Sequence, residues 1–590
     1  MKQIKEIINN KTTKNTLFSI LGTIGIVKAY ELTSVANLTN NIMNIFIFIM
    51  LINIYEKNEK YEKKERIFSY CYSMFLSIIL IIGTQLDTQG EIIWSLMTLI
   101  KIICLTFTII PITLYSVNLI KKVNPNKIKL NKKKMAILIF ITIFLFNFLV
   151  FLALYPGVYG YDAGFQILEV RNNKVQLTSH FSVLFSVILA DCVNLGKTLF
   201  NNYQTGLAIF ALLQMTFMTY VATRISLYVI NKTKNKILFT ISMLFFCLFP
   251  PYTIMTISTI QDVMFAGISA LIVLNLIELA NNKKYYDKKL NPIKLIVLIT
   301  LACILRNNGV YAILVTIPFI LIFKKDKKIL TLIILTIPII TYKIYTGPIH
   351  KIMKVKNEPS TREIVSIPSQ QLARVYNYNY GILNKKDLET YDRYYLNLEN
   401  FEYYLINPEI ADLIKAELNV QETKDNFANY LQFWVGIGIK DPENYIEAFL
   451  LNNLATWYPN KTYADYRMYH PYIEYNMLDA KKWNKDYIEI KRSSKFPLYE
   501  KILRLTIEKN AWKKVPIIST AFTPGFYFLI YIYTLGICII KKKTHYIIPL
   551  SYLAGIYATV IMAPVSLFRY CFPIIILAPV MMSIITEKEK

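Results

Sequence analysis

Long apolar runs alternate with short basic loops along most of the chain. Many of the runs approach the ~20 residues that a helix needs to cross a bilayer. Placing all the basic loops on the cytoplasmic side makes the runs occur in pairs, which predicts about 14 transmembrane helices with both termini inside. The expected spans are 16–32, 38–55, 67–86, 92–120, 135–154, 205–230, 237–256, 262–280, 292–305, 308–323, 328–346, 517–540, 545–563 and 568–586.

One apolar stretch, residues 179–198, does not fit this alternation. Counting it as a span would place the basic loop NKTKNK at 231–236 on the wrong side, and the stretch contains Asp191. It is therefore expected to be an interfacial helix that lies along the outer leaflet. The two short spans that meet at RNNG, residues 306–309, place polar groups at a depth where they are tolerated only in a cavity or within packed protein.

Residues 347–516 differ from the rest of the chain and predict a soluble domain on the outer side. The region is rich in tyrosine and contains four of the five tryptophans. Segments with helical periodicity and proline near their first turn predict mostly short helices. The expected fold is an all-α integral membrane protein with three parts: 1–346, which includes an outer loop and interfacial helices at 155–204, the extracytoplasmic domain 347–516, and the last spans in 517–590.

The formal net charge of +27 is explained by this topology. Within 347–516 there are 24 Lys and Arg against 22 Asp and Glu, whereas the rest of the chain has 42 basic and 17 acidic residues. The excess lies mostly in short loops between apolar runs, as the positive-inside rule predicts. The expected partner is the lipid bilayer, and nucleic-acid binding is not needed to account for the charge.

The seven cysteines all lie outside residues 347–516. An extracytoplasmic domain without disulfides fits a bacterial surface better than a secretory pathway. The first apolar run lacks a small-residue cleavage site and is expected to be a retained signal anchor. These features predict a multi-pass protein of the bacterial plasma membrane.

Four polar motifs from separate parts of the chain fall on the same face of the predicted membrane. The first is YPGVYGYDAG, residues 155–164, which follows an apolar run and contains a single carboxylate. Ionisable groups near membrane depth are costly and usually mark a pathway or a site. The convergent residues are Asp162 and His180, then Gln261 and Asp262, then Arg306, Asn307 and Asn308, and finally Arg569 and Tyr570.

Together these motifs resemble the GT-C superfamily of polytopic glycosyltransferases, and most closely a bacterial branch whose activity is not characterised. The resemblance rests on YPGVYGYD, a following histidine, the QD pair, RNNG and FRYCFP at 568–573, and it extends from about residue 135 to the C-terminus. The chain departs from the pattern after His180, where HFSV replaces a proline-rich sequence. It also lacks D-x-D and WWDYG motifs, which argues against an oligosaccharyltransferase.

The resemblance implies transfer of a sugar from a polyprenyl-phosphate carrier to an envelope glycan, glycolipid or protein at the outer face. Asp162 is the expected general base, and Arg569, followed by Arg306, is expected to bind the phosphate. No cofactor is assigned, and a divalent cation is left open, with Asp262 as a residue that could ligate it. The expected substrate-binding residues are His180, Asp262, Arg306, Asn307, Trp457, Arg569 and Tyr570.

Each of these residues also has a purely structural interpretation. Asp162 and Asp262 could cap the helices that follow them. Arg569 could extend to lipid head groups, and Arg306 could pair with a neighbouring helix. His180 could be an ordinary interfacial histidine. The aromatic residues of the outer region, including Trp457, His470 and the run YADYRMYHPYIEY, either stack on sugar rings or form a tyrosine-rich core.

Three other functions stay open beside the glycosyltransferase. A transporter or flippase of lipid-linked saccharides would show repeat symmetry and charges near the membrane midplane. A polysaccharide polymerase or ligase would place several arginines in its large outer loop to bind pyrophosphate carriers. A non-catalytic envelope scaffold would not depend on the carboxylates.

Overall fold

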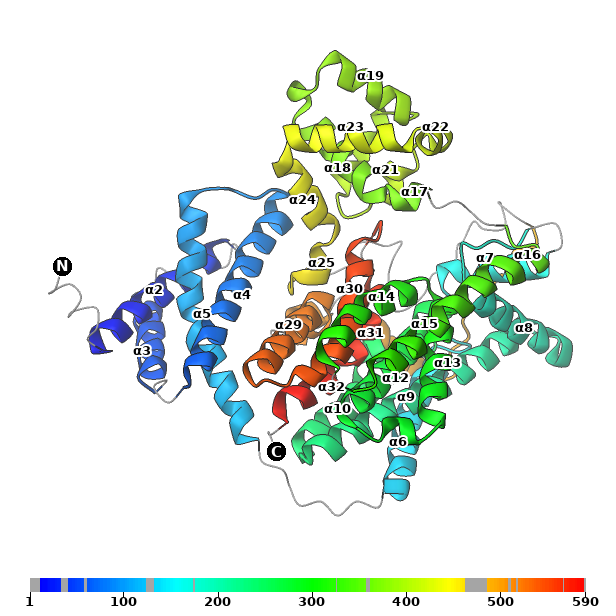
Figure 1. The fold of residues 1–590 in the computed structure, drawn as a ribbon, viewed down its shortest axis with the longest axis horizontal. Helices are drawn as coiled ribbons and strands as arrows, with labels where there is room; N and C mark the ends of the chain where they lie inside the picture. The colour runs from blue at the N-terminus through cyan, green and yellow to red at the C-terminus, as the bar shows by residue number, and fades with distance from the viewer. Residues whose placement is uncertain are drawn as a thin grey trace.

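The computed structural model describes residues 11–32, 41–57, 61–123, 132–172, 176–324, 326–356, 361–461, 485–507, 511–515, 518–565 and 567–587. Most of this part of the chain is helical, and its strand-like pairing is confined to four isolated β-bridges. Helices satisfy their own backbone hydrogen bonds, as a bilayer requires. The fold is therefore that of an all-α membrane protein, as the sequence predicts (Figure 1).

The N-terminal helices form a group beside the rest of the molecule, on the left of Figure 1. Within it, α5 packs against both α2 and α4. The group joins the central bundle mainly through α4, which contacts α29. Its helices are α2 (Lys11–Leu32), α3 (Asn41–Lys57), α4 (Lys63–Gln89) and α5 (Leu96–Lys122).

The central bundle contains the remaining long apolar helices around one large hydrophobic core. Helix α12 and the α31–α32 segment are its most buried candidate spans. Their apolar side chains face other helices rather than lipid. The bundle comprises α6 (Lys132–Ala153), α9 (Tyr203–Thr233), α10 (Lys236–Leu248), α11 (Pro250–Met255), α12 (Gln261–Asn281), α13 (Leu290–Leu305), α14 (Asn308–Phe323), α15 (Lys328–Ile344), α29 (Pro524–Ile540), α30 (Ile547–Ile561), α31 (Phe568–Ile576) and α32 (Ala578–Thr586).

In the described residues, every apolar run that was predicted as a span falls on one or two helices of the N-terminal group or of the central bundle. By length and composition, 9 helices in the described residues could cross a membrane, and four shorter apolar helices, α10, α13, α14 and α29, accompany them. The chain is thus a multi-pass membrane protein. The larger count of about 14 spans, and the side on which the termini lie, stay predictions.

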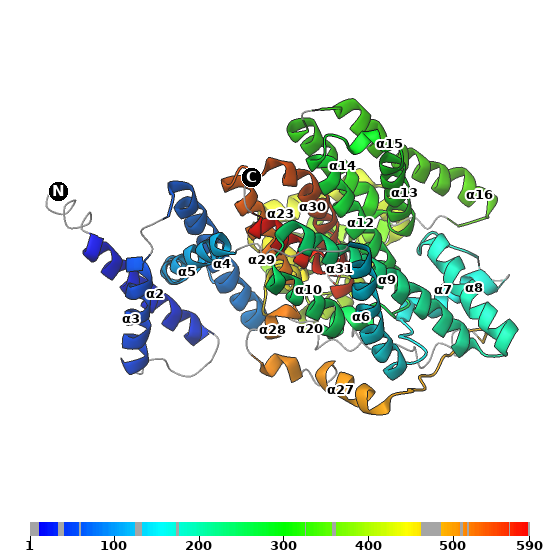
Figure 2. The same ribbon diagram turned by 90° about the horizontal axis from the view of Figure 1, so that it is seen from below.

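Two helices extend sideways from the bundle, α7 (Tyr161–Arg171) and α8 (Val183–Phe200), as Figures 1 and 2 show. Helix α8 occupies the stretch that the sequence assigned to the membrane interface. It is nevertheless apolar and long enough to be one of the candidate spans. Its far end exposes Leu199 and Phe200, as expected of a helix that contacts lipid. Its assignment to the interface stays a prediction.

Residues 361–461 form a separate unit, here called the helical domain, above one end of the bundle (Figure 1). Its core contains many tyrosines, including the fully buried Tyr391, Tyr404 and Tyr430. The tyrosine-rich core that the sequence allowed is therefore present, whereas His470 and the run YADYRMYHPYIEY lie outside the described residues. The helices of the domain are α17 (Thr361–Ile364), α18 (Ser366–Tyr378), α19 (Lys385–Tyr394), α20 (Tyr403–Ile406), α21 (Asp412–Lys415), α22 (Val420–Asp425), α23 (Phe427–Lys440), α24 (Pro442–Asn452) and α25 (Leu454–Trp457).

Residues 485–507 return to the central bundle instead of joining the helical domain. Tyr487 and Ile488 belong to the large core of the bundle. The backbone N–H of Ser493 donates to the carbonyl of Tyr155 at 2.9 Å, and the Tyr159 hydroxyl donates to the carbonyl of Ile488 at 3.0 Å. The region 347–516, which was predicted as one outer domain, thus supplies both the helical domain and a segment, ending in α27 (Pro497–Ile507), that supports α6 and α7.

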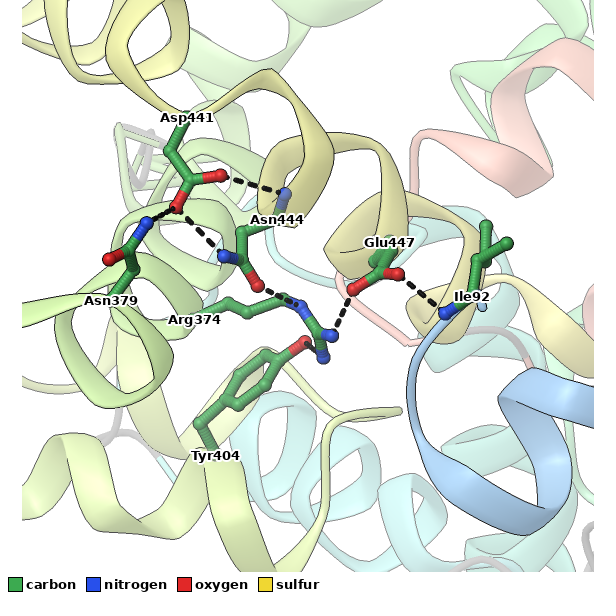
Figure 3. Close-up of polar contacts among 7 residues, drawn as sticks. All are labelled: Ile92, Arg374, Asn379, Tyr404, Asp441, Asn444 and Glu447. Carbon is green, nitrogen blue, oxygen red and sulfur yellow. Dashed lines mark hydrogen bonds and ion pairs between the residues drawn. The ribbon is translucent and has the colours of Figure 1, made fainter. Parts of the chain in front are cut away.

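A buried polar network connects the helical domain to the loop between α4 and α5 (Figure 3). Arg374, with a side chain 1% exposed, forms an ion pair with Glu447 and donates to Asn444 at 2.9 Å and to the Tyr404 hydroxyl at 3.2 Å. The other carboxylate oxygen of Glu447 accepts from the backbone N–H of Ile92 at 2.5 Å. The network therefore fixes α18 and α24 to each other and to the end of the α4–α5 hairpin.

Candidate functional site

The motif YPGVYGYDAG pairs with the loop before α12. Val158 and Ser258 form a parallel β-bridge, in which the Val158 N–H donates to the Ile257 carbonyl at 3.1 Å and the Thr259 N–H donates to the Val158 carbonyl at 3.0 Å. The Gly160 N–H donates to the Thr259 hydroxyl at 2.8 Å. This pairing places the start of α7 beside the start of α12.

Glycine is required at position 157 of this motif. Gly157 has a φ of +129°, a conformation that L-residues with a side chain rarely adopt. A Cβ atom there would also lie 3.0 Å from the Cβ of Ala211 and 3.1 Å from the Ile257 carbonyl oxygen. The glycine thus permits the close approach of the two loops.

The paired loops position two carboxylates in equivalent places. Asp162 is the second residue of α7, and Asp262 is the second residue of α12. The N-cap positions belong to Gly160 and Ile260, so the interpretation of these aspartates as helix caps is wrong. Both carboxylates lie in a first turn, where the helix dipole stabilises negative charge.

The break between α13 and α14 supplies the first arginine. Arg306 is the C-cap residue of α13, with extended backbone, and α14 begins two residues later. Gly309 lets the two helices approach, because a Cβ atom there would lie 2.9 Å from backbone atoms of Ala302. Arg306 forms an ion pair with Asp262, which agrees with the interpretation that it pairs with a neighbouring helix.

The start of α31 supplies the second arginine together with a tyrosine ring. Arg569 Nη1 donates to Asp162 Oδ2 at 2.8 Å, and its Nε lies 3.6 Å from Asp262 Oδ2. The guanidinium carbons of Arg306 and Arg569 lie 4.6 Å and 5.3 Å from the ring centroid of Tyr570. Arg569 therefore faces protein carboxylates, and the interpretation that it only extends to head groups is wrong.

These five residues form one cluster, here called the Asp–Arg cluster: Asp162, Asp262, Arg306, Arg569 and Tyr570. The two carboxylates balance the two guanidinium groups in charge. Asp262 is 4% exposed, whereas the arginines are 17% and 18% exposed and Asp162 is 26% exposed. Asp162 is thus the most accessible charged group of the cluster.

The helical domain covers the α31 side of the cluster. The Ala411 N–H donates to the Pro564 carbonyl at 2.8 Å, and Ile410 and Val565 form an antiparallel bridge. Ile410, Val565 and Leu567 share a small hydrophobic cluster against which Tyr570 packs. The helical domain and the Asp–Arg cluster therefore lie at the same end of the bundle.

The structure places His180 and Asn307 beside the cluster rather than in it. Both residues are exposed, and neither has a hydrogen bond or ion pair to the four charged side chains among the described contacts. The ring of His180 packs edge-on against Phe181, with centroids 4.7 Å apart. Asn307 follows Arg306 directly and occupies the N-cap position of α14.

Trp457 lies in a different environment, because it packs where the helical domain meets α4 and α29. Its indole N–H donates to the Leu450 carbonyl at 3.3 Å. Stacking on a sugar ring stays a prediction for this residue. Among the described residues, no group of three or more His, Cys, Asp or Glu is arranged to hold a metal ion.

Several neutral polar residues build the site without having been predicted. Gln214 on α9 donates to the carbonyls of Thr256 and Ser258 at 3.1 Å and 2.7 Å. The Ser182 N–H donates to the Gln261 amide oxygen at 3.0 Å, and the Ser182 hydroxyl donates to the Ile304 carbonyl at 3.0 Å. The sequence feature that could have identified them is an amide or hydroxyl side chain within an apolar stretch, because a polar group there needs a hydrogen-bond partner.

The fold and the cluster define a class of protein: a multi-pass, all-α membrane protein with two carboxylates and two arginines paired beneath a helical domain. Residues 172–590, well over half of the chain, match the family of unknown function DUF6020, and the chain belongs to that family. The matched range begins after Asp162 and includes the other seven predicted site residues. No curated protein and no solved structure matches the chain.

Proposed function

We propose that the protein is a GT-C type glycosyltransferase that moves a sugar from a polyprenyl-phosphate carrier to an acceptor of the cell envelope, at the outer face of a bacterial membrane. Support comes from the motifs that carry the resemblance, because their charged side chains are the ones that meet in the cluster. One observation carries the proposal: Asp162, an accessible carboxylate, lies 2.8 Å from Arg569 with a second arginine alongside.

In the proposed reaction, the oxygen of an acceptor hydroxyl attacks the anomeric carbon of the sugar. The bond between this carbon and the phosphate oxygen breaks, and the carrier leaves as a phosphate monoester. Asp162 accepts the hydroxyl proton as general base. The leaving group departs already ionised, so a single carboxylate can serve the proton transfer without a general acid.

The arginines are proposed to stabilise the phosphate as its charge grows. A sugar-linked phosphodiester carries one negative charge, and the released monoester approaches two. Preorganised guanidinium groups bind the more charged state more strongly, so they favour the transition state over the bound donor. Tyr570, stacked against both arginines, would maintain their orientation.

Two observations favour this function over the alternatives. A flippase would place its charges near the midplane of broken helices, whereas three of the four charged residues here lie at the starts of α7, α12 and α31, and Arg306 alone of the four lies at a helix break. A polymerase would need arginines available in its large outer region. Of the three arginines in the helical domain, Arg374 and Arg393 are already paired with Glu447 and Glu422.

The test replaces Asp162 by Asn in cells that contain normal amounts of the protein, followed by mass spectrometry of the envelope glycans. Loss of the general base is expected to reduce transfer by about 10²- to 10⁴-fold, so the glycan should disappear. Asp191→Asn is the matched control, because Asp191 is an exposed carboxylate on α8. Normal glycans in Asp162→Asn cells would contradict the proposal. Accumulation of a lipid-linked precursor on the inner leaflet would favour the flippase.

A further inference from the structure

The charges of the Asp–Arg cluster are fully matched within the protein. Arg306 is paired with Asp262, and Arg569 is paired with Asp162 and lies close to Asp262. A cluster with equal positive and negative charge offers an incoming anion no net attraction. An anion binds the guanidinium groups more strongly when one carboxylate gives up its arginine.

The two carboxylates are not equivalent in this respect. Asp262 is 4% exposed and lies close to both arginines, so its removal would leave Arg306 without its ion-pair partner and Arg569 with Asp162 alone. Asp162 is 26% exposed, and the ion pair described for it is with Arg569. It is also in the first turn of an 11-residue helix at the edge of the bundle. Asp162 is therefore the carboxylate that can leave its arginine at the lower cost.

The resting ion pair also occupies the groups that the proposed reaction needs. Arg569 Nη1 donates to Asp162 Oδ2, so this N–H cannot at the same time donate to a phosphate oxygen. The same carboxylate oxygen already accepts one hydrogen bond and has fewer sites left for an acceptor hydroxyl. In this state a phosphate can use only the remaining N–H groups of Arg569, and separation of the two side chains makes the full guanidinium edge and the whole carboxylate available.

We infer that binding of the carrier phosphate exchanges the partner of Arg569. The phosphate takes the place of Asp162 on Arg569, Asp262 keeps both arginines in position, and the released Asp162 carboxylate becomes available to the acceptor. The exchange is a change of ion-pair partner, without a covalent step. It rests on the proposed function for the identity of the anion, a lipid-linked monophosphate.

The exchange imposes an order on the two substrates. Without a carrier phosphate, Asp162 is held by Arg569, and the arginine competes with a hydroxyl in the site for the carboxylate. With the phosphate bound, the base is released beside the sugar that the carrier presents. The carrier therefore binds before the acceptor, and the site stays inactive toward a hydroxyl group that arrives alone.

The test measures binding of farnesyl phosphate to the purified full-length protein in detergent by isothermal titration calorimetry. Asp162→Asn keeps the shape of the side chain but removes the charge that competes for Arg569. The variant is expected to bind farnesyl phosphate about tenfold more tightly than the wild type, which corresponds to about 1.4 kcal/mol. Unchanged or weaker binding would overturn the inference, and Asp162→Ala repeats the test without an amide group.

A double-mutant cycle separates the exchange from simple charge repulsion. If Asp162 competes for Arg569, the gain from Asp162→Asn should disappear in an Arg569→Gln background. A gain that persists there would show repulsion through space and overturn the exchange. Farnesol, which lacks the phosphate, should bind all variants alike. Inorganic phosphate shows whether the effect belongs to phosphate itself or requires the lipid.

The binding result and the proposed function can fail separately. Tighter binding in Asp162→Asn together with normal envelope glycans would support the exchange and reject the glycosyltransferase. Unchanged binding together with lost glycans would reject the exchange and leave the proposed function in place. Thermal melting of each variant beside Asp191→Asn confirms that the compared proteins are folded.

Discussion

Asp262 is the residue on which the geometry of the Asp–Arg cluster depends. It forms an ion pair with Arg306, lies 3.6 Å from the Nε of Arg569, and is almost fully buried. Its place in the first turn of α12 adds the favourable interaction with the helix dipole. Asp262 thus acts as a positioning residue that holds two cations together.

We predict that Asp262→Asn destabilises the protein as well as abolishing activity. Removing one charge of a buried pair leaves the other uncompensated, at a typical cost of about 3–5 kcal/mol. Thermal unfolding of the purified protein should show a clear fall in melting temperature, whereas Asp191→Asn on α8 should melt like the wild type. An unchanged melting temperature for Asp262→Asn would show that the arginines do not depend on it.

The sequence could name the charged residues of the cluster but not their pairing. Asp162 and Arg569 are separated by 407 residues, and local patterns contain no information about a contact over that distance. Gln214, Ser182 and Thr259 were missed for a different reason. They are neutral residues in apolar surroundings, and their role depends on which backbone carbonyls and N–H groups the fold brings near them.

The pairing of residues 157–160 with 257–260 is the element that sets the two carboxylates side by side. It consists of a few backbone hydrogen bonds and the close contact at Gly157. Such a short connection is sensitive to a small displacement, and positioning errors of about 1 Å can reduce catalysis by about 10²-fold. The apolar pattern predicted the flanking helices, but it did not predict that the two loops pair.

We predict that Gly157→Ala reduces activity by tenfold or more while the protein still folds. A strained backbone conformation costs about 1–3 kcal/mol, and the added Cβ pushes against Ala211 and Ile257. Gly381→Ala is the matched control, because a Cβ there meets nothing within 4 Å. Transfer activity and melting temperature are measured on the same preparations of both variants. Equal activity of Gly157→Ala and Gly381→Ala would contradict the prediction.

The tyrosine core gives the helical domain a characteristic sensitivity to alkali. Burial raises the pKa of Tyr430 to about 12, although hydrogen bonds with Tyr395 and Ser369 lower it. An unfolded tyrosine ionises near pH 10. The folded state therefore keeps the full stabilisation from its buried, protonated tyrosines below pH 10. This stabilisation is lost as the pH rises toward 12, by up to about 1.4 kcal/mol per pH unit for each such tyrosine.

We predict that raising the pH above 10 unfolds the helical domain cooperatively in the full-length protein. Tyrosinate absorbance and helical circular dichroism, followed together, should change in the same pH range. Tyr430→Phe removes one group of this kind, so its transition should shift to higher pH once its melting temperature at neutral pH is taken into account. Ionisation of all the tyrosines near pH 10 with intact helices would contradict the prediction.

At the scale of the whole molecule, the helical domain connects the N-terminal helices to the site. Glu447 bonds to the Ile92 N–H, and Lys461 bonds to Asp87 at the end of α4 at 2.8 Å. On the other side, Ala411 bonds to Pro564, five residues before Arg569. The domain is thus fixed both to the N-terminal helices and to the central bundle, and it limits the movement of α31.

We predict that Glu447→Ala loosens the helical domain. Arg374 is 1% exposed and would lose its carboxylate, at a cost of about 3–5 kcal/mol, while the Ile92 N–H would lose its acceptor. Limited proteolysis of the full-length protein should cut the domain faster than in the wild type. Glu443→Ala, a change at an exposed position on the same helix, is the control. Equal cleavage of the two variants would contradict the prediction.

The sequence predicted the class of the molecule better than its division into parts. Apolar length alone indicated a multi-pass, all-α protein, since a bilayer leaves few other solutions. The lengths of the apolar runs did not reveal that residues 485–495 return along α6 and α7, because this segment is polar enough to resemble a surface loop. Its contacts, such as Tyr487 in the central core, depend on the tertiary fold.

The most direct test of the central claim measures release of the carrier. Purified protein is incubated with the solubilised envelope fraction of a host strain that lacks it, which supplies both the lipid-linked sugar and the acceptor, and mass spectrometry quantifies free polyprenyl phosphate and the remaining lipid-linked sugar. The wild type and Asp191→Asn are expected to convert lipid-linked sugar into polyprenyl phosphate, whereas Asp162→Asn and Arg569→Gln are not. Equal release by Asp162→Asn, or lipid-linked sugar that stays chemically unchanged with the wild type, would contradict the central claim.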